Sequence, residues 1–259
     1  MEKRPCAMKT LLRLPYRIYY CTIAVPLFVL ATILLSSVAV AGCALGGRRI
    51  FGYWPGVFWS RIALAVFLCP TRIVGRENIP RDHRPCVVMA NHQGAFDIFM
   101  MYGLLPIPFR WVMKESLRKV PFMGKACQMA GFIFVDDKRV GSIKETMTCA
   151  RQVLSEGTSI FIFPEGSRTL TGRMDRFKKG GFVLAHELEV PIIPVSIDGS
   201  YRALKAKSRW VNPTRLTLTI HPAIQIDRAE EFPRNMLQAL TEVRTAIASA
   251  LPSEQEVHE

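Results

Sequence analysis

Residues 86–99 read CVVMANHQGAFDIF, and the change of pattern inside this stretch predicts the fold. The run of residues 86–90 is short and almost wholly apolar, which is typical of a strand that a sheet buries on both faces. A polar turn follows, and residues 95–104 then have the pattern of a helix. The stretch therefore predicts one strand–turn–helix unit of an α/β sheet.

The same alternation of short apolar runs and longer helical patterns continues along the chain after residue 70. Further strands are predicted at residues 109–114, 132–135, 159–164, 191–198 and 215–222. Further helices are predicted near residues 140–155, 180–189 and 235–250. The alternation predicts an α/β fold, with a mixed and mostly parallel sheet flanked by helices.

The segment before residue 70 differs from the rest and predicts a membrane anchor. Residues 18–47 contain no charged residue, and about 20 apolar residues are enough for a helix to cross a bilayer. A second apolar stretch, residues 51–70, is rich in aromatic side chains and contains a single charged residue, Arg61. Basic residues precede the first stretch and favour a cytoplasmic N-terminus; they are Lys3, Arg4, Lys9, Arg13 and Arg17.

Two helices in a hairpin, inserted or half-inserted in the bilayer, would return the chain to the side on which it began. An arginine such as Arg61 can extend from a shallow helix to the interface. We therefore expect two parts: residues 1–70, which anchor the protein to the membrane, and residues 71–259, an α/β domain on the cytoplasmic side of the cytoplasmic membrane. Two alternatives stay open, a cleaved signal peptide and lipoprotein processing at the sequence VAGC, which ends at Cys43.

Charge and cysteine content narrow the class of protein. The formal net charge of +13 indicates an anionic partner, such as a membrane surface, a phosphate-bearing substrate or nucleic acid. Nucleic acid is disfavoured, because the aromatic residues gather in the membrane-like segments rather than among the basic ones. The seven cysteines are scattered without a CxxC pair, which argues against a disulfide framework and a metal site and indicates a reducing compartment.

His92 and Asp97 form a candidate acid–base pair. His92 follows the predicted strand, and Asp97 falls in the first turn of the predicted helix, where a negative charge is favoured. A carboxylate at this spacing can hold an imidazole in one tautomer and stabilise its protonated form. Alternatively, Asn91 or Asp97 caps the helix and His92 is an incidental loop residue. No GxSxG motif is present, so a histidine base would activate a substrate hydroxyl rather than a protein nucleophile.

A second group of candidate residues follows the predicted strand at residues 159–164. Gly166 permits a close approach of the backbone to a ligand, and the guanidinium of Arg168 is suited to bidentate recognition of phosphate. Such ligands bind outside the carboxyl ends of strands in α/β sheets. Lys178 lies nearby in RFKKGGF, residues 176–182. The alternative is a solvated turn in which Glu165 and Arg168 form a surface ion pair.

These residues together resemble the glycerolipid acyltransferase family, typified by 1-acyl-glycerol-3-phosphate acyltransferase. The resemblance rests on four motifs in the same order. They are the Asn-His-x4-Asp motif at residues 91–97, the Phe-Pro-Glu-Gly-Ser-Arg block at residues 163–168, the Lys-containing segment at residues 176–182 and the Val-Pro-Ile-Ile-Pro-Val run at residues 190–195. The resemblance covers roughly residues 75–225 and implies the glycerol-phosphate acyltransferase-like α/β fold.

The sequence departs from the family pattern in two places. Many members have serine where this chain has Gly94, so a hydroxyl is missing there. The second motif of the family usually reads Gly-x-x-Phe-Ile-x-Arg, whereas GFIFVDDKR, residues 131–139, puts Asp137 in the place of the arginine. Lys138 or Arg139 could take over the contact of that arginine with the acceptor.

The resemblance implies direct transfer of a fatty acyl group from acyl carrier protein or acyl coenzyme A to the sn-2 hydroxyl of 1-acyl-glycerol-3-phosphate. His92 would be the general base, and Asp97 would orient it. The resemblance further implies no metal and no cofactor besides the acyl donor. The residues that it implies would hold the acceptor are Asn91, Lys114, Arg139, Glu165, Gly166, Arg168 and Lys178.

Two kinds of alternative remain for the function. The same chemistry could act on another acceptor, such as a lyso-ornithine lipid, a lysophospholipid or glycerol-3-phosphate. The chain could also be a non-catalytic, membrane-anchored protein that binds lipid. The two kinds differ in one observable way, because a binding protein has no reason to need His92.

Overall fold

The computed structural model describes residues 14–82, 84–136, 142–205, 208–226 and 231–252. Its centre is a seven-stranded sheet of order β1-β7-β6-β2-β5-β3-β4. The strands are β1 (Thr71–Val74), β2 (Val87–Ala90), β3 (Phe109–Lys114), β4 (Ile133–Val135), β5 (Ser159–Ile162), β6 (Ile192–Asp198) and β7 (Leu216–Ile220). The pair β6–β7 is antiparallel, and the other pairs are parallel. The predicted mixed, mostly parallel sheet is confirmed.

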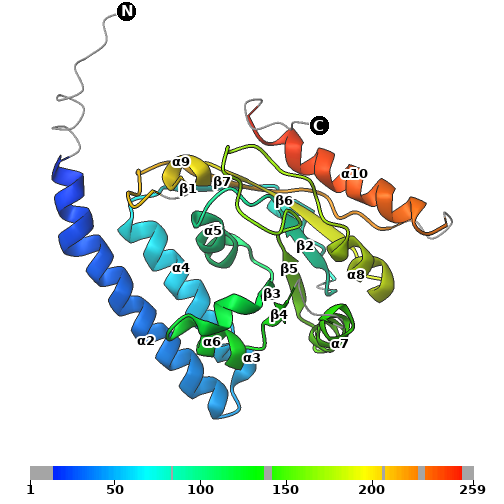
Figure 1. The fold of residues 1–259 in the computed structure, drawn as a ribbon, viewed down its shortest axis with the longest axis horizontal. Helices are drawn as coiled ribbons and strands as arrows, with labels where there is room; N and C mark the ends of the chain where they lie inside the picture. The colour runs from blue at the N-terminus through cyan, green and yellow to red at the C-terminus, as the bar shows by residue number, and fades with distance from the viewer. Residues whose placement is uncertain (1–13, 83, 137–141, 206–207, 227–230, 253–259) are drawn as a thin grey trace, which may run out of the picture.

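Helices cover both faces of this sheet (Figure 1). Those before β3 are η1 (Tyr20–Ala24), α2 (Val25–Ala44), α3 (Arg48–Phe51), α4 (Trp54–Val66), η2 (Arg76–Asn78) and α5 (Phe96–Leu104). Those after it are η3 (Glu115–Lys119), α6 (Met123–Met129), α7 (Ser142–Ser155), α8 (Gly180–Leu188), α9 (Ser200–Ala203) and α10 (Arg234–Ser249).

Alternation along the strands divides the interior into two cores. Side chains of a strand point to opposite faces in turn. In β2, Val88 and Ala90 pack with α4 and α5, whereas Val87 and Met89 pack with α7, α8 and α10. All four residues are fully buried, which explains why β2 is an unbroken apolar run.

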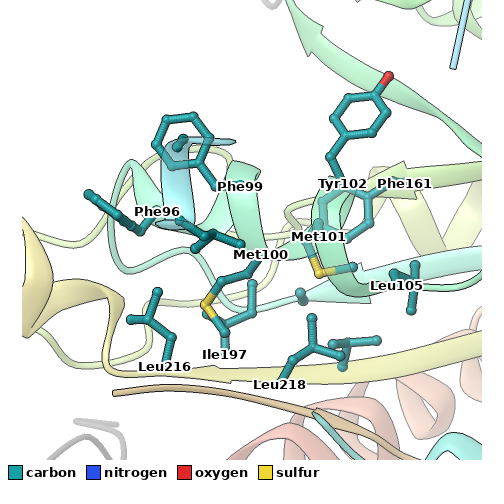
Figure 2. Packing of buried hydrophobic residues seen from close by; sticks show 14 of the residues in the cluster. Phe96, Phe99, Met100, Met101, Tyr102, Leu105, Phe161, Ile197, Leu216 and Leu218 are labelled. Atoms are coloured by element: carbon teal, nitrogen blue, oxygen red, sulfur yellow. The ribbon is translucent and has the colours of Figure 1, made fainter. Parts of the chain in front are cut away.

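Helix α5 contributes much of the first core. Met100 and Met101 are fully buried, and Figure 2 shows Met100 beside Ile197 of β6, with Leu216 of β7 nearby. This packing fixes α5 against the sheet, and with it the turn that joins β2 to α5. The turn carries His92, so its position depends on the apolar face of α5.

The N-terminal segment forms one long helical stretch, Leu14–Ala44, which is long and apolar enough to cross a membrane. Among the described residues, no other helix is both long enough and apolar enough. The second apolar segment forms α4, of 13 residues, which is about 20 Å long at 1.5 Å per residue and too short for a bilayer core of about 30 Å. Helix α4 packs against both α2 and α5. The division at residue 70 stays a prediction, and the helices before it share a core with the sheet.

Five of the six predicted strands match with small shifts at their ends. The predicted strand at residues 159–164 ends at Ile162, and the one at residues 132–135 begins at Ile133. Strand β1 and the segment from η3 to α6 were not predicted. The basic residues before Leu14, and Arg139, lie outside the described residues.

Candidate functional site

The candidate residues that the structure describes lie at the carboxyl ends of neighbouring strands of the sheet. Strands β3, β5 and β2 are parallel neighbours, so their carboxyl ends lie at the same edge, where α/β sheets bind ligands. Lys114 ends β3, the Glu165–Arg168 turn follows β5, and His92 follows β2. The order of strands therefore brings together three segments that are far apart in the sequence.

His92 and Asp97 are in direct contact. Nδ1 of His92 lies 2.8 Å from Oδ2 of Asp97, whose side chain is fully buried. The same oxygen accepts backbone N–H groups from Gln93 at 2.6 Å and Gly94 at 2.8 Å. An ionised carboxylate only accepts hydrogen bonds, so Nδ1 of His92 is the donor and Nε2 is left able to take a proton.

Phe163 fixes the plane of the imidazole. Its ring stacks on His92 with 3.8 Å between the ring centroids and an angle of 7° between the planes. Together, Phe163 and Asp97 restrict both the tilt and the rotation of the imidazole. The sequence pattern indicates no role for Phe163, although this residue stands in the same motif as Arg168.

Glu165 holds the backbone of His92. Its carboxylate accepts the N–H of His92 at 2.6 Å with one oxygen and the N–H of Asp175 at 2.8 Å with the other. The carbonyl of His92 accepts the N–H of Thr169 at 3.0 Å. The alternative of a surface ion pair between Glu165 and Arg168 is wrong, because Glu165 is only 5% exposed. Its predicted contact with the acceptor stays a prediction.

The burial of Glu165 has a consequence for stability. Burial raises the pKa of Glu165 to about 8, although the two backbone N–H donors lower it in part. A glutamate in the unfolded chain titrates near 4.5, so between these values the folded protein holds a proton that the unfolded chain has released. The free energy of unfolding should therefore fall as the pH rises through this window and level off above it.

We expect Glu165→Gln to remove this dependence, since glutamine does not titrate. The unfolding temperature of the variant relative to the parent should rise between pH 5 and pH 9, on top of a constant loss from one missing backbone hydrogen bond. Thermal unfolding of both proteins at several pH values measures the difference, in which the other titrating groups cancel. A difference that stays constant with pH would show that Glu165 is ionised throughout.

Asn91 braces the end of β2 against β6. Its side-chain amide donates to the carbonyl of Ile197 at 2.9 Å, and its side-chain carbonyl accepts the N–H of Ile197 at 2.8 Å. The alternative in which Asn91 caps the following helix is therefore wrong. A role for Asn91 toward the acceptor stays a prediction.

The cations of the site differ in position. The ammonium of Lys178 lies over Gly166, where a Cβ atom placed on the glycine would come within 2.8 Å of Nζ. Arg168 and Lys114 are exposed at the same sheet edge, and neither forms an ion pair with any described residue. The structure therefore joins Lys178 to Gly166 and leaves two further cations available at this edge. Arg139 cannot be placed, because it lies outside the described residues.

The close packing around position 94 explains why a glycine stands there. A Cβ atom at this position would lie 2.5 Å from Oγ and 2.9 Å from the carbonyl oxygen of Ser200, at the start of α9. Ser200 is fully buried, so its hydroxyl occupies the space that a side chain at position 94 would need. No signal in the sequence links these two positions.

The described residues contain no group of three histidine, cysteine or acidic side chains that could hold a metal ion. The six cysteines among them are free thiols. What the edge offers is a histidine held by a buried carboxylate, with cations beside it. This arrangement can remove a proton from a hydroxyl and bind an anionic group.

Known proteins are similar to this chain in sequence and in fold. The Acyltransferase family model matches residues 70–198. A 1-acyl-sn-glycerol-3-phosphate acyltransferase of Chlamydomonas reinhardtii is 31% identical over 210 residues, which is 80% of this chain and 60% of that protein. The 1-acyl-sn-glycerol-3-phosphate acyltransferase alpha of Mus musculus is 31% identical over 198 residues, 74% of this chain and 68% of that protein.

A chloroplastic 1-acyl-sn-glycerol-3-phosphate acyltransferase of Brassica napus is 29% identical and covers 71% of this chain. The chain spans 60% and 53% of the algal and plant relatives. The crystal structure of the 1-acyl-sn-glycerophosphate acyltransferase PlsC from Thermotoga maritima superposes with a TM-score of 0.74 at 23% identity, covering 93% of this chain and 96% of that one. This last likeness concerns the fold.

Proposed function

Because the chain belongs to the 1-acyl-sn-glycerol-3-phosphate acyltransferase family, we propose that it transfers a fatty acyl group to the sn-2 hydroxyl of 1-acyl-glycerol-3-phosphate and forms phosphatidic acid. The observation that carries the proposal is the contact of 2.8 Å between His92 and the buried carboxylate of Asp97, at the carboxyl edge of the sheet beside Arg168 and Lys178.

His92 acts as the general base. Nε2 removes the proton of the acceptor hydroxyl while the hydroxyl oxygen attacks the thioester carbonyl of the donor. The new C–O bond forms, the C–S bond breaks, and the thiolate leaves with the proton that His92 gives back. Asp97 stabilises the imidazolium between these steps. Acyl carrier protein or acyl coenzyme A supplies the thioester, and no protein nucleophile takes part.

The cations hold the phosphate of the acceptor. Arg168 binds it through the fork of its guanidinium, and Lys178 and Lys114 add charge at the same edge. Gly166 has a φ of +76°, in the left-handed region that favours glycine. Its missing side chain lets the backbone of the turn approach the ligand. Glu165 contributes indirectly, because it fixes the backbone of His92.

The experiment is a panel of acceptors with two donors. Purified protein in detergent is given a radiolabelled acyl group on acyl carrier protein or coenzyme A. The acceptors are 1-acyl-glycerol-3-phosphate, glycerol-3-phosphate, a lysophospholipid and a lyso-ornithine lipid. Labelled phosphatidic acid should be the main product. Faster labelling of another acceptor would keep the chemistry and change the substrate, whereas binding without transfer would favour a lipid-binding protein.

The N-terminal helices form the membrane anchor in this proposal. Helix α4 is too short to cross the bilayer. Two hydrogen bonds join the first helical stretch to it: Tyr19 donates to the carbonyl of Val66 at 2.8 Å, and Trp59 donates to the hydroxyl of Thr32 at 2.8 Å. A helix held along the domain in this way enters one leaflet as a hairpin more readily than it crosses alone.

We therefore expect both ends of the chain on the cytoplasmic side. Reporters fused before Met1 and after Glu259, which are active only on one side of the membrane, measure this directly. Both fusions should give the cytoplasmic signal. Signals from opposite sides would show a single crossing, and would separate the site from a cytoplasmic acyl donor.

A further inference from the structure

The segment between β3 and α6 exposes apolar side chains that its own fold leaves uncovered. Leu117 is 36% exposed, Val120 37% and Phe122 56%. All three lie within the short stretch of residues 117–122, called here the 117–122 loop. Apolar side chains gathered in this way on a protein surface mark a contact with a membrane or another molecule.

The backbone of Phe122 is held in an unfavourable conformation. Its φ is +59° and its ψ is −57°, and the N–H of Met123 donates to the carbonyl of Pro121 at 2.6 Å. This is the strained form of the γ-turn, which bulky residues avoid. The strain would be expected where it brings a side chain into a core, yet here it presents a phenylalanine to the outside. Strained backbone of this kind is typical of functional contacts.

Basic residues surround the loop, but not all of them are available. Arg118 is bound to Glu115 by two hydrogen bonds, at 2.5 and 3.1 Å, and its guanidinium lies 4.1 Å from the centre of the Phe134 ring. Lys119 and Lys125 are exposed, and among the described residues neither has an ion pair. Exposed apolar side chains flanked by lysines are the pattern of a segment that lies in the interface of an anionic membrane.

The position of the loop agrees with this pattern. The loop leads into α6, which packs against α2, and Figure 1 shows α6 beside the C-terminal half of α2. The surface of α2 bears exposed apolar side chains along its length, including Leu30, Leu34 and Val38. The 117–122 loop is therefore joined directly to the helix that packs on the proposed anchor. It also begins three residues after Lys114, the last residue of β3, and so starts near the end of the sheet that carries His92.

We propose that the 117–122 loop is a second membrane contact, which inserts Leu117, Val120 and Phe122 among lipids while Lys119 and Lys125 bind anionic headgroups. The inference extends the membrane association proposed above from the N-terminal hairpin to the α/β domain. It holds the acceptor edge of the sheet against the bilayer surface. An acidic carrier protein is the other occupant that the charge of the loop would suit, and the test below separates the two.

The test places a photo-reactive side chain at two matched positions in the full chain. Phe122→p-benzoylphenylalanine carries the probe in the loop. Phe232→p-benzoylphenylalanine is the control, because Phe232 is 54% exposed and precedes α10, which covers the opposite face of the sheet. Each protein is incorporated into vesicles that contain radiolabelled phosphatidylcholine, with or without phosphatidylglycerol, and is irradiated with and without acyl carrier protein.

We expect labelled lipid at position 122 to exceed that at position 232 at least tenfold, and to fall several-fold when phosphatidylglycerol is omitted. Lys119→Glu in the protein with the probe at position 122 should produce a similar fall in anionic vesicles. Equal labelling at both positions would overturn the proposal, as would an adduct that forms only with acyl carrier protein. The readout does not use catalysis, so its failure is distinct from a failure of the proposed reaction.

Discussion

Replacement of His92 by alanine should lower turnover by about 10²–10⁴-fold, the usual effect of losing a general base. The protein should stay folded. Asp97 keeps its two backbone donors, Gln93 and Gly94, and the backbone of His92 is still held by Glu165 and Thr169. The measurement is the initial rate with saturating donor and acceptor, together with thermal unfolding of the variant.

His221 offers the matched control for this prediction. It lies just after β7, two strands away from β2, with Nε2 2.7 Å from Oγ of Ser196, which also donates to the carbonyl of Ile247 on the face of the sheet covered by α10. His221→Ala should leave turnover close to that of the parent, even if stability falls. Near-normal turnover of His92→Ala would exclude His92 as the base. Unchanged binding of the acceptor by the same variant is expected under either outcome.

Arg168→Lys should lower catalytic efficiency roughly ten- to a hundredfold with phosphorylated acceptors. Lysine keeps the charge but loses the fork, and one charge-assisted hydrogen bond contributes about 1.5–3 kcal/mol. Arg168 is exposed, so the substitution should not disturb the fold. The measurement is kcat/KM for 1-acyl-glycerol-3-phosphate, with the KM of the acyl donor determined alongside and expected to stay constant.

Arg151→Lys is a suitable control, because Arg151 is exposed on α7, which packs on the sheet face away from α4 and α5. It should behave as the parent. An equal loss for donor and acceptor in Arg168→Lys would indicate that Arg168 supports the turn instead. If Arg168→Lys matched the parent, the phosphate contact would belong to Lys114 or Arg139.

The sequence predicted those parts of the fold whose signal is local. Strand β3 matches the predicted residues 109–114 at both ends, because its apolar run stands between clear turns. Strand β1 was missed, since it is an edge strand of four residues, TRIV, that is largely exposed and therefore has no apolar run to detect. Helix α6 has seven residues, too few for a helical period to be recognised.

The sequence predicted those side-chain contacts of the site that the spacing along the chain determines. His92 and Asp97 are five residues apart in one strand–turn–helix unit, and their side chains are hydrogen-bonded. The orientation of Glu165 was not predictable, because a carboxylate after a strand can face a ligand or the backbone with the same sequence. The contact of Gly94 with Ser200 depends on how α9 approaches α5. Such packing between distant segments has no local signature.

The loop that holds the backbone of His92 also carries Arg168, and this has a consequence for the choice of acceptor in the proposed reaction. Because Glu165 and Thr169 bind the N–H and the carbonyl of His92, the backbones at positions 92 and 168 are held at a set separation. With the acceptor's phosphate on Arg168, this separation selects how far from the phosphate a free hydroxyl must lie to meet Nε2, and 1-acyl-glycerol-3-phosphate has only the sn-2 hydroxyl free. The sn-2 oxygen is one carbon nearer to the phosphate than the sn-1 oxygen. A change in the length of this loop should therefore shift the preference from 1-acyl-glycerol-3-phosphate, whose free hydroxyl is sn-2, toward its 2-acyl isomer, whose free hydroxyl is sn-1, before it abolishes the reaction.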